Sequence, residues 1–282
     1  MPKEFQQGNN NHTQLKDKRI IKSPVNSIST FETSYDTQVK LWNEYYAGTG
    51  LDTAEITNSA KLSTPYIDGE YPDVNSLVDC IVQMLKRDFV MQDCQDRRNF
   101  IADPYGNVFP IDFGQVHTPE SSRFYDTYKS DVLQQLRKLT KKTECYRTYD
   151  DCLAEINEHK NKELLKKLCK KAETKVHNRR WTLGGAGKRV NIGTDSFVVP
   201  GHLAKAIKSS KSKITMNPEE FQSNLLDSLR QHKTSKVKWM TSRDVWTQDL
   251  YDGKTDNPSV FFQKLINDKR DKAAYSANSL CD

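Results

Sequence analysis

One stretch of the chain carries two oxygen-bearing side chains at a spacing that suits a metal ion. Asn99 and Asp112 lie at the two ends of an expected hairpin, with strands at 99–102 and 108–111 joined by a turn at 103–106 (Asp-Pro-Tyr-Gly). The hairpin folds the chain back on itself, so that residues thirteen apart in the sequence can converge on one ion. Amide and carboxylate oxygens are ligands that magnesium prefers, and phosphoryl transfer requires magnesium beside the phosphates. Asn99 and Asp112 are therefore predicted to be magnesium ligands.

Phosphoryl transfer also uses an acidic group near the acceptor hydroxyl, and two aspartates precede Asn99. Asp93 and Asp96 both fall in the polar loop 92–98. We favour Asp93 as the group that orients the acceptor hydroxyl, with Asp96 as the runner-up. The alternative is that both carboxylates only solvate a surface loop.

The same stretch resembles the protein-kinase superfamily. Members of that superfamily hold magnesium with a catalytic-loop Asn and the Asp of a DFG motif, and here the hairpin that begins at Asn99 leads into Ile-Asp-Phe-Gly at 111–114. The sequence GNVFPIDFG at 106–114 is also similar to the motif GN-L-F-x-IDFG of phosphoinositide kinases. The family places its catalytic Asp five residues before the Asn, where this chain has Cys94. The match therefore requires a loop that is one residue longer, or a different base.

The resemblance implies an α+β fold of two lobes, a small β-rich N-lobe and a larger helical C-lobe, with ATP and Mg²⁺ bound between them. The N-lobe and hinge are expected to span residues 1–67, and residues 68–282 are expected to form the C-lobe, with basic additions toward its end. The connector 62–69 would be the hinge between the lobes, and Tyr66 within it is a predicted cofactor contact.

The resemblance also implies roles for residues of the N-lobe. Lys22 resembles the strand-three lysine that contacts the phosphates, and Gly8, which three asparagines follow, resembles a reduced phosphate-covering loop. Two alternatives remain: Lys18, four residues earlier and on the same strand face, has this role, or Lys22 is only a surface strand residue. The ion-pair partner of Lys22 is expected on the next helix. The carboxylates available there are Glu44, which we prefer, Glu32 and Asp36.

The spacing of apolar residues predicts the elements that position these side chains. Short polar strands are expected within 3–22, and helices at 37–46 and 74–88. Asp131 either resembles the Asp that starts the helix beneath a kinase catalytic loop or is an ordinary helix cap. Beyond Gly114 the chain is expected to be helical at 130–139, 150–171 and 219–231, with loops at 184–193 and 209–213.

Positive charge is concentrated in the second part of the chain. Residues 1–114 hold 11 Lys and Arg against 16 Asp and Glu, whereas residues 115–282 hold 32 against 21. Such an excess attracts polyanions, although Lys-rich helices are often only solvated faces. No pattern of stacking aromatic residues indicates single-stranded nucleic acid. A polyanion bound here would be an inositol phosphate or an anionic lipid, and the alternative is an ordinary solvated surface. The residues predicted to frame this polyanion site are Lys175, Arg179, Arg180, Lys188, Arg189, Lys208 and Lys211.

The composition predicts a soluble protein. Hydrophobic residues make up 35% of the chain, no apolar run approaches the eighteen or so residues of a membrane span, and the first ten residues contain no hydrophobic signal core. Six cysteines are scattered without a CxxC pair, so reduced thiols are expected. The expected location is the cytoplasm, or a host cytoplasm that the protein reaches by secretion without a conventional signal peptide.

These features together predict an atypical protein kinase, which uses ATP and magnesium to phosphorylate Ser or Thr hydroxyls of a protein substrate. A kinase this reduced resembles the divergent effector kinases that Legionella-like intracellular bacteria secrete into host cells, which implies a host protein as substrate. The alternatives are a phosphoinositide kinase, a kinase-like enzyme that transfers AMP or another group, and a pseudokinase that acts as an interaction module. The shifted position of the loop aspartate motivates the last of these.

Overall fold

The computed structural model describes four parts of the chain: residues 11–24, 33–177, 187–232 and 257–267. Gly8, Arg179 and Arg180 lie outside these parts.

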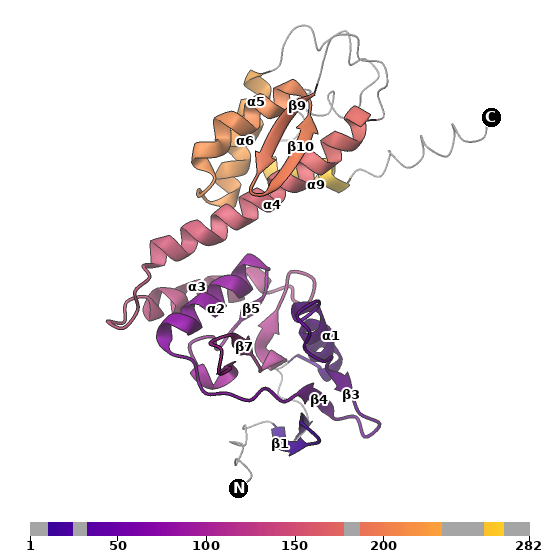
Figure 1. Ribbon diagram of the computed structural model, residues 1–282, viewed down its shortest axis with the longest axis vertical. Helices are drawn as coiled ribbons and strands as arrows, with labels where there is room; N and C mark the ends of the chain where they lie inside the picture. The colour runs from indigo at the N-terminus through magenta and orange to yellow at the C-terminus, as the bar shows by residue number, and fades with distance from the viewer. Residues whose placement is uncertain (1–10, 25–32, 178–186, 233–256, 268–282) are drawn as a thin grey trace, which may run out of the picture. The chain divides into compact units, whose positions relative to one another are not determined.

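The chain forms two compact units, each of which combines helices with small antiparallel sheets (Figure 1). Unit 1 comprises residues 1–152 and unit 2 residues 153–282, so the division falls inside the long helix α4 (Tyr149–His177). The α+β class predicted from the sequence is confirmed. The predicted lobe boundary at residue 67 lies within unit 1, and the expected C-lobe is divided between the two units.

Unit 1 begins with a four-stranded antiparallel sheet of order β1-β2-β4-β3. Its strands are β1 (Asn11–Lys16), β2 (Arg19–Pro24), β3 (Glu55–Ile56) and β4 (Leu62–Pro65). β2 lies between β1 and β4, and Lys22 is paired with Leu62. The short strands expected within 3–22 are confirmed as β1 and β2. The first half of the expected connector is instead β4, because its four residues are buried and pair with strands on both sides.

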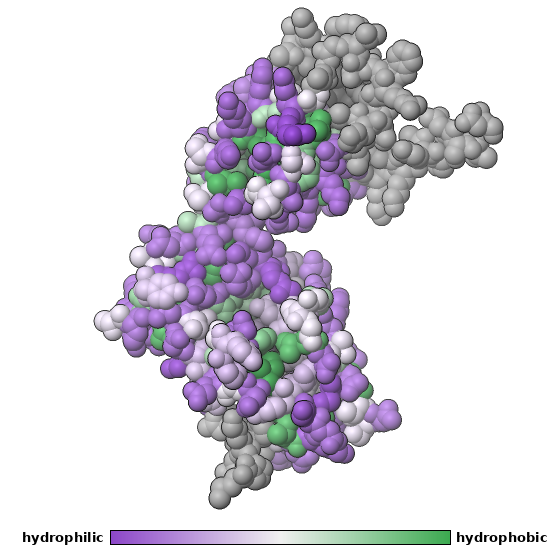
Figure 2. Space-filling view, viewed as in Figure 1, coloured by the Kyte–Doolittle hydropathy of each residue, from purple (hydrophilic) through white to green (hydrophobic). Residues whose placement is uncertain are grey.

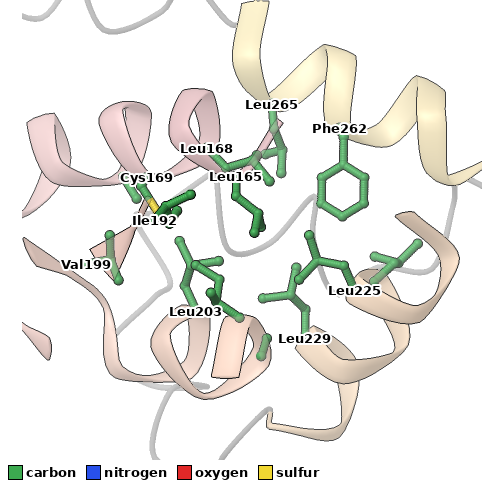
Figure 3. Close-up of a cluster of buried hydrophobic side chains, with 14 of the residues drawn as sticks. Leu165, Leu168, Cys169, Ile192, Val199, Leu203, Leu225, Leu229, Phe262 and Leu265 are labelled. Atoms are coloured by element: carbon green, nitrogen blue, oxygen red, sulfur yellow. The ribbon is translucent and has the colours of Figure 1, made fainter. Parts of the chain in front are cut away.

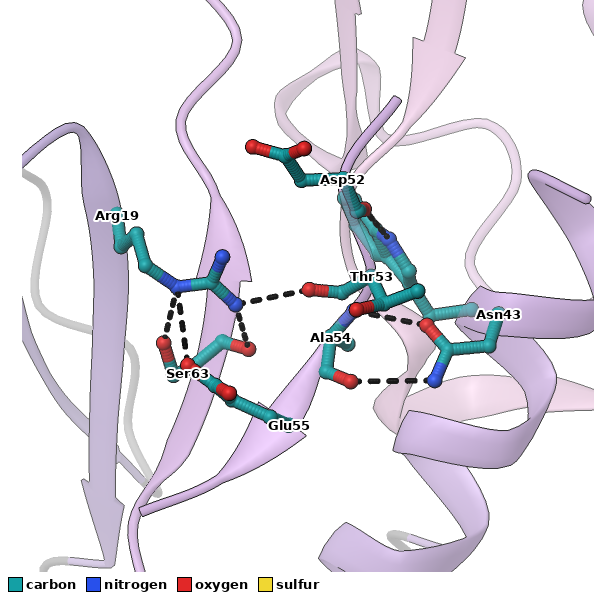
Figure 4. A network of polar contacts seen from close by, with 8 residues as sticks. Arg19, Asn43, Asp52, Thr53, Ala54, Glu55 and Ser63 are labelled. Carbon is teal, nitrogen blue, oxygen red and sulfur yellow. Dashed lines mark hydrogen bonds and ion pairs between the residues drawn. The ribbon is translucent and has the colours of Figure 1, made fainter. Parts of the chain in front are cut away.

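Side-chain bonds to the backbone attach helix α1 (Tyr35–Tyr45) to this sheet. Asn43 of α1 donates to the Ala54 carbonyl (3.1 Å) and accepts from the Ala54 N–H (2.8 Å). Arg19 of β2 donates from Nη2 to the carbonyl of Thr53 (2.8 Å) and from Nε to Oγ of Ser63 (2.6 Å), as Figure 4 shows. The segment before β3 is thus bonded to α1 on one side and to β2 on the other.

The remainder of unit 1 contains the predicted helix and hairpin. Helix α2 begins after Asp73, whose carboxylate accepts from the N–H groups of Asn75 and Ser76 and so caps the helix. Strands β6 and β7 form the hairpin, and β5, which precedes it, pairs antiparallel with β8, which follows it. The bounds are α2 (Val74–Lys86), β5 (Val90–Met91), β6 (Phe100–Ala102), β7 (Val108–Pro110), β8 (Val116–His117) and α3 (Tyr125–Leu139), with 3₁₀ turns η1 (Arg97–Asn99) and η2 (Phe113–Gln115).

The connector after β4 runs beside β6. The N–H of Glu70 donates to the carbonyl of Ala102 (3.0 Å), and the N–H of Ala102 donates to the carbonyl of Glu70 (2.7 Å). Gly69 approaches β6 so closely that a Cβ atom there would lie 2.1 Å from the carbonyl oxygen of Ala102 and 2.7 Å from Cγ2 of Ile101. Only glycine fits this approach of one backbone to another.

Gly69→Ala is therefore expected to lower the free energy of unfolding by about 1–3 kcal/mol, the usual cost of overpacking. Thermal unfolding followed by circular dichroism would measure the loss. Gly201→Ala is the matched control, because the nearest atom to a Cβ at Gly201 is Cγ of Lys188 at 3.9 Å, an ordinary contact. Equal melting temperatures for Gly69→Ala and the wild-type protein would contradict the close approach.

Unit 2 has its own hydrophobic core. Helix α4 contributes Leu165, Leu168 and Cys169 to this core, which Figure 3 shows from close by. Residues from the hairpin and the later helices complete it, among them Val199 and Phe262. The other elements are β9 (Lys188–Ile192), β10 (Asp195–Val199), α5 (Gly201–Ser210), η3 (Lys211–Lys213), α6 (Pro218–Gln231) and α9 (Pro258–Asn267).

Three sequence predictions for the later part of the chain need correction or extension. The expected loop 184–193 contains strand β9, which pairs with β10 across a turn where Gly193 has a φ of +61°. The expected loop 209–213 consists of the end of α5 and the turn η3. The predicted helices are confirmed, although α3 begins at Tyr125 and α4 continues to His177. No helix in the described parts is long and apolar enough to cross a membrane.

Candidate active site

An ion pair joins the four-stranded sheet of unit 1 to the turn that follows the β6–β7 hairpin. Nζ of Lys22, on β2, lies 3.1 Å from Oδ1 of Asp112, and the two side chains are 15% and 38% exposed. Oδ1 of Asp112 also accepts from the N–H of Gly114 (3.2 Å). The positive charge of Lys22 and these hydrogen bonds lower the pKa of Asp112, so its carboxylate is ionised at neutral pH.

Lys18 and Glu44, two other candidates for this ion pair, lie elsewhere, and Glu32 is outside the described residues. Lys18 is in the turn between β1 and β2, with a φ of +59°, and its side chain is exposed. Glu44 is on the exposed side of α1, whose opposite side buries Leu41 and Trp42. The Lys22–Glu44 pair predicted from the sequence is therefore replaced in this structure by Lys22–Asp112.

Aromatic packing holds the turn that carries Asp112. Phe113 is 2% exposed, and its ring lies 5.3 Å from that of Trp42 and 5.9 Å from that of Tyr45, both on α1. The hydroxyl of Tyr46 donates to the carbonyl of Pro110 (2.6 Å) at the end of β7. Helix α1 and the residue that ends it thus position both ends of the turn.

Thr33, just before α1, bonds to the same turn. Its N–H donates to the carbonyl of Gly114 (2.9 Å), and its hydroxyl donates to the carbonyl of Phe113 (3.1 Å). The sequence analysis missed Thr33, because nothing in its local sequence indicates a partner some eighty residues away.

Asn99 lies at the mouth of the hairpin, beside the residue that precedes Asp112. Its carbonyl accepts from the N–H of Ile111 (2.8 Å), so the hairpin does bring the two predicted ligand positions together. Nδ2 of Asn99 donates to the carbonyl of Asp93 (3.1 Å). This bond occupies the nitrogen end of the amide and leaves Oδ1 as the end that can bind a cation.

The donor set at this position fits magnesium. One amide oxygen and one carboxylate leave most of an octahedral shell to phosphate oxygens and water, as is usual where magnesium is bound with nucleotides. Within the described residues there is no group of three or more His, Cys, Asp or Glu side chains that could hold a metal ion by themselves. A metal ion held by Asn99 and Asp112 would therefore need further ligands, such as phosphate oxygens and water.

The two candidate bases have different surroundings. Asp96 caps η1 and forms a two-pronged ion pair with Arg98, with Nε of Arg98 2.9 Å from Oδ1 and Nη2 2.6 Å from Oδ2. Hydrogen bonds from Arg98 lower the pKa of Asp96. Asp93 is exposed, and its own backbone carbonyl is bonded to Asn99. Asp96 thus has a structural role, whereas Asp93 is exposed to solvent.

The position five residues before Asn99, where the resemblance to protein kinases led us to look for an aspartate, is occupied by a buried thiol. Cys94 is 1% exposed, and its Sγ donates to Oε1 of Gln135 on α3 (3.4 Å). Asp131, one turn earlier on α3, is exposed. Neither interpretation of Asp131 fits the structure, because α3 begins at Tyr125 and Asp131 therefore neither starts nor caps a helix. The residue that bonds to the loop is Gln135.

The remaining predicted site residues are spread over both units. Tyr66 is half-buried, and its hydroxyl donates to Asp68 (3.0 Å). Lys175 belongs to the last turns of α4, where side chains are not described. In unit 2 the exposed members of the predicted polyanion set are Lys188, Arg189, Lys208 and Lys211.

His117, on β8, is a buried polar residue that the sequence analysis did not single out. It is 5% exposed, its ring stacks on that of Tyr128 (4.4 Å between centroids), and neither ring nitrogen has a hydrogen-bond partner among the described residues. Burial lowers the pKa of His117 below its usual value of 6.5, because the charged form would lose its hydration.

This burial predicts that the protein loses stability on mild acidification. Below about pH 6.5 the unfolded chain binds a proton at residue 117 while the folded chain does not, so the free energy of unfolding falls as the pH decreases. His117→Phe keeps a ring against Tyr128 and should make this decrease smaller between pH 7 and pH 5.5. Urea unfolding at both pH values measures it, and equal decreases in the two proteins would contradict the prediction.

A comparison with protein-family models finds no family that matches this chain. A comparison with curated protein sequences finds no significant match.

Proposed function

We propose that unit 1 is a kinase-like phosphotransferase that uses ATP and magnesium to phosphorylate a protein hydroxyl. The single observation that carries the proposal is the Lys22–Asp112 ion pair of 3.1 Å, which brings a strand lysine to the Asp of an Ile-Asp-Phe-Gly turn. A lysine and a carboxylate in contact are groups that phosphoryl transfer uses around a triphosphate and its metal ion.

The pairing of β5 with β8 supports this proposal. Val90 pairs with His117 and Met91 with Val116, and the N–H of Gln92 donates to the carbonyl of Gln115 (3.1 Å). The loop, the hairpin and the Asp112 turn are therefore all enclosed between two paired strands. An enclosed segment of this kind can hold a base and two metal ligands in fixed relative positions. Such positioning, together with electrostatic stabilisation, provides most of the rate enhancement in phosphoryl transfer.

Each residue has a defined role in this proposal. Lys22 binds phosphate oxygens, Asn99 and Asp112 bind magnesium, and Asp93 accepts a hydrogen bond from the acceptor hydroxyl. Magnesium, when bound, neutralises charge on the phosphates. The sheet β1–β4 would act as the N-lobe and the rest of unit 1 as the core of the C-lobe, with ATP between them.

The test is to incubate the full chain with γ-labelled ATP and magnesium, and to offer generic protein substrates and phosphoinositide vesicles in separate reactions. Label on protein Ser or Thr supports the proposal. Label on lipid alone would replace it with a phosphoinositide kinase, and a product whose mass has increased by an adenylate group would replace it with AMP transfer. Measurable ATP binding without any turnover would overturn it in favour of a nucleotide-binding interaction module.

For unit 2 we propose binding of a soluble polyanion, such as an inositol phosphate. Lys188 and Arg189 of β9 are exposed, and the position of a Cβ at Gly201, where α5 begins, is 3.9 Å from Cγ of Lys188. The exposed lysines of α5 and η3 follow this point, and hydrophilic residues cover much of the visible face of unit 2 (Figure 2). These cations are Lys205, Lys208, Lys211 and Lys213.

Calorimetric titration with inositol hexakisphosphate at physiological salt tests this second proposal, because weak surface attraction is largely screened there. The double variant Lys188→Glu/Arg189→Glu should bind at least about tenfold more weakly. Lys162→Glu is the control, since Lys162 is on α4 and already pairs with Glu158 (2.6 Å). Absence of binding, or an equal loss per charge in the control, would contradict a specific site.

A further inference from the structure

One side chain, that of Gln135 on α3, bonds to the loop on both sides of Asp93. Its Nε2 donates to the carbonyl of Gln92. Its Oε1 accepts from the N–H of Gln95 (3.3 Å) and from the thiol of Cys94 (3.4 Å). The three partners are the residue before Asp93 and the two residues after it.

The chemistry of the amide suits this arrangement. An amide donates and accepts at once, whereas an ionised carboxylate only accepts and could not bond to the carbonyl of Gln92. Burial raises the pKa of Cys94 to about 12, so its thiol stays protonated and can serve as the donor. Cys94 is 1% exposed, whereas its neighbour Asp93 is exposed. The hydrogen bond to Gln135 therefore keeps the Cys94 side chain in the interior, and the Asp93 side chain lies on the solvent side of the loop.

Helix α3, which carries Gln135, is packed in the core of unit 1. Val132, Leu136 and Leu139 are each no more than 2% exposed and fix the helix in the core of unit 1. Gln135 lies next to Leu136 and is itself half-buried. The position of a side chain on a packed helix varies less than that of a side chain on a loop. Such a side chain can therefore restrict the positions of the groups to which it bonds.

We propose that Gln135 is the positioning residue of the site, which sets the loop 92–96 so that the carboxylate of Asp93 faces the acceptor. Gln135 acts through the loop and does not touch a reacting atom. Its catalytic consequence rests on the proposed function of unit 1, whereas its effect on the loop does not.

The first test measures the loop itself, independently of catalysis. Hydrogen exchange of the Gln95 N–H is compared in the wild-type protein, Gln135→Leu and Asp131→Asn. Gln135→Leu removes the acceptor of this N–H and should speed its exchange by about tenfold or more, while Asp131→Asn, one turn away and exposed, should leave it unchanged. Equal exchange in all three proteins would overturn the proposal.

The second test separates positioning from general stability by its kinetics. Gln135→Leu should lower kcat by about 10–100-fold, as is usual for residues that orient catalytic groups, and leave KM for ATP within about twofold. Gln135→Glu should lower kcat at pH 8 and recover toward the wild-type value as the pH approaches 5.5, because a protonated carboxyl can again donate to the Gln92 carbonyl. A ratio of Gln135→Glu to wild-type activity that does not change with pH would overturn the positioning role.

Absence of transfer by the wild-type protein would overturn the proposed function of unit 1. In that case the exchange of the Gln95 N–H would still decide whether Gln135 holds the loop. Failure of the proposed function and failure of this inference are therefore distinguishable.

Discussion

Asp112→Asn is expected to lower kcat/KM for phosphoryl transfer by on the order of 10²–10³-fold, the loss that follows removal of one preorganised electrostatic group. The substitution removes the only charged ligand proposed for magnesium and the charge that Lys22 contacts at 3.1 Å. Asn keeps the shape of the side chain and one acceptor oxygen for the N–H of Gly114. The measurement is initial-rate transfer from γ-labelled ATP over a range of magnesium concentrations.

The loss should be catalytic and not a loss of folding. Both members of the ion pair retain some exposure to water, 15% and 38%, and a pair of this kind contributes about 0–1 kcal/mol to stability. Asp17→Asn is the matched control, because Asp17 is exposed in the β1–β2 turn with a φ of +50°, which Asn tolerates. Full activity in Asp112→Asn, at any magnesium concentration, would exclude Asp112 as a metal ligand.

Lys22→Met is expected to have the second large effect, a loss of about 10²-fold or more in kcat/KM. Methionine retains the length of the side chain and much of its packing, but it places no charge beside the phosphates. Its neighbour on the same hairpin, Lys18→Met, should remain active, because Lys18 lies in the turn and its side chain is exposed. The two variants carry the same chemical change four residues apart and differ mainly in their distance from Asp112.

The comparison of these two lysines is made with the transfer assay and with a direct measurement of ATP binding. Lys22→Met should weaken binding or lower kcat, depending on whether Lys22 contacts the phosphates in the ground state or mainly in the transition state. Equal activities of Lys22→Met and Lys18→Met would contradict the site as proposed. The opposite order, with only Lys18→Met inactive, would move the site to the turn.

The local features of the site could be predicted from the sequence because short-range interactions determine them. The turn of the hairpin is an example, since Asp103 accepts from the N–H groups of Tyr105 (2.9 Å) and Asn107 (2.8 Å) within five residues. Helix α2 is another, with a capping Asp73 and one continuous apolar face. Once the hairpin and its flanks were recognised, the proximity of Asn99 to the Asp112 turn followed from the register of the strands.

The partners of individual side chains depended on contacts between distant segments, and these are where sequence predictions failed. Lys22 and Asp112 are 90 residues apart, and their contact arises because aromatic rings of α1 hold the Asp112 turn in place. Glu44 was a reasonable partner by spacing, but the side of α1 on which it lies faces water. Periodicity identifies a helix and its apolar side, yet it does not say which polar residue at the margin of that side will meet a given strand.

The sequence by itself determined which chemical groups this chain can offer. They are an amide and a carboxylate at the ends of a hairpin, a lysine on an early strand, and two aspartates in the loop that precedes the hairpin. Tertiary structure alone decided which of these groups are free to act. It left Asp93 exposed and bonded the loop to Gln135, 40 residues beyond its N–H partner in the chain. The Asp96–Arg98 pair, by contrast, is a local contact between residues two apart. Tertiary structure also divided the chain within α4, because the part of α4 from Leu165 onward packs with later segments, as far as Leu265, in a hydrophobic core of its own.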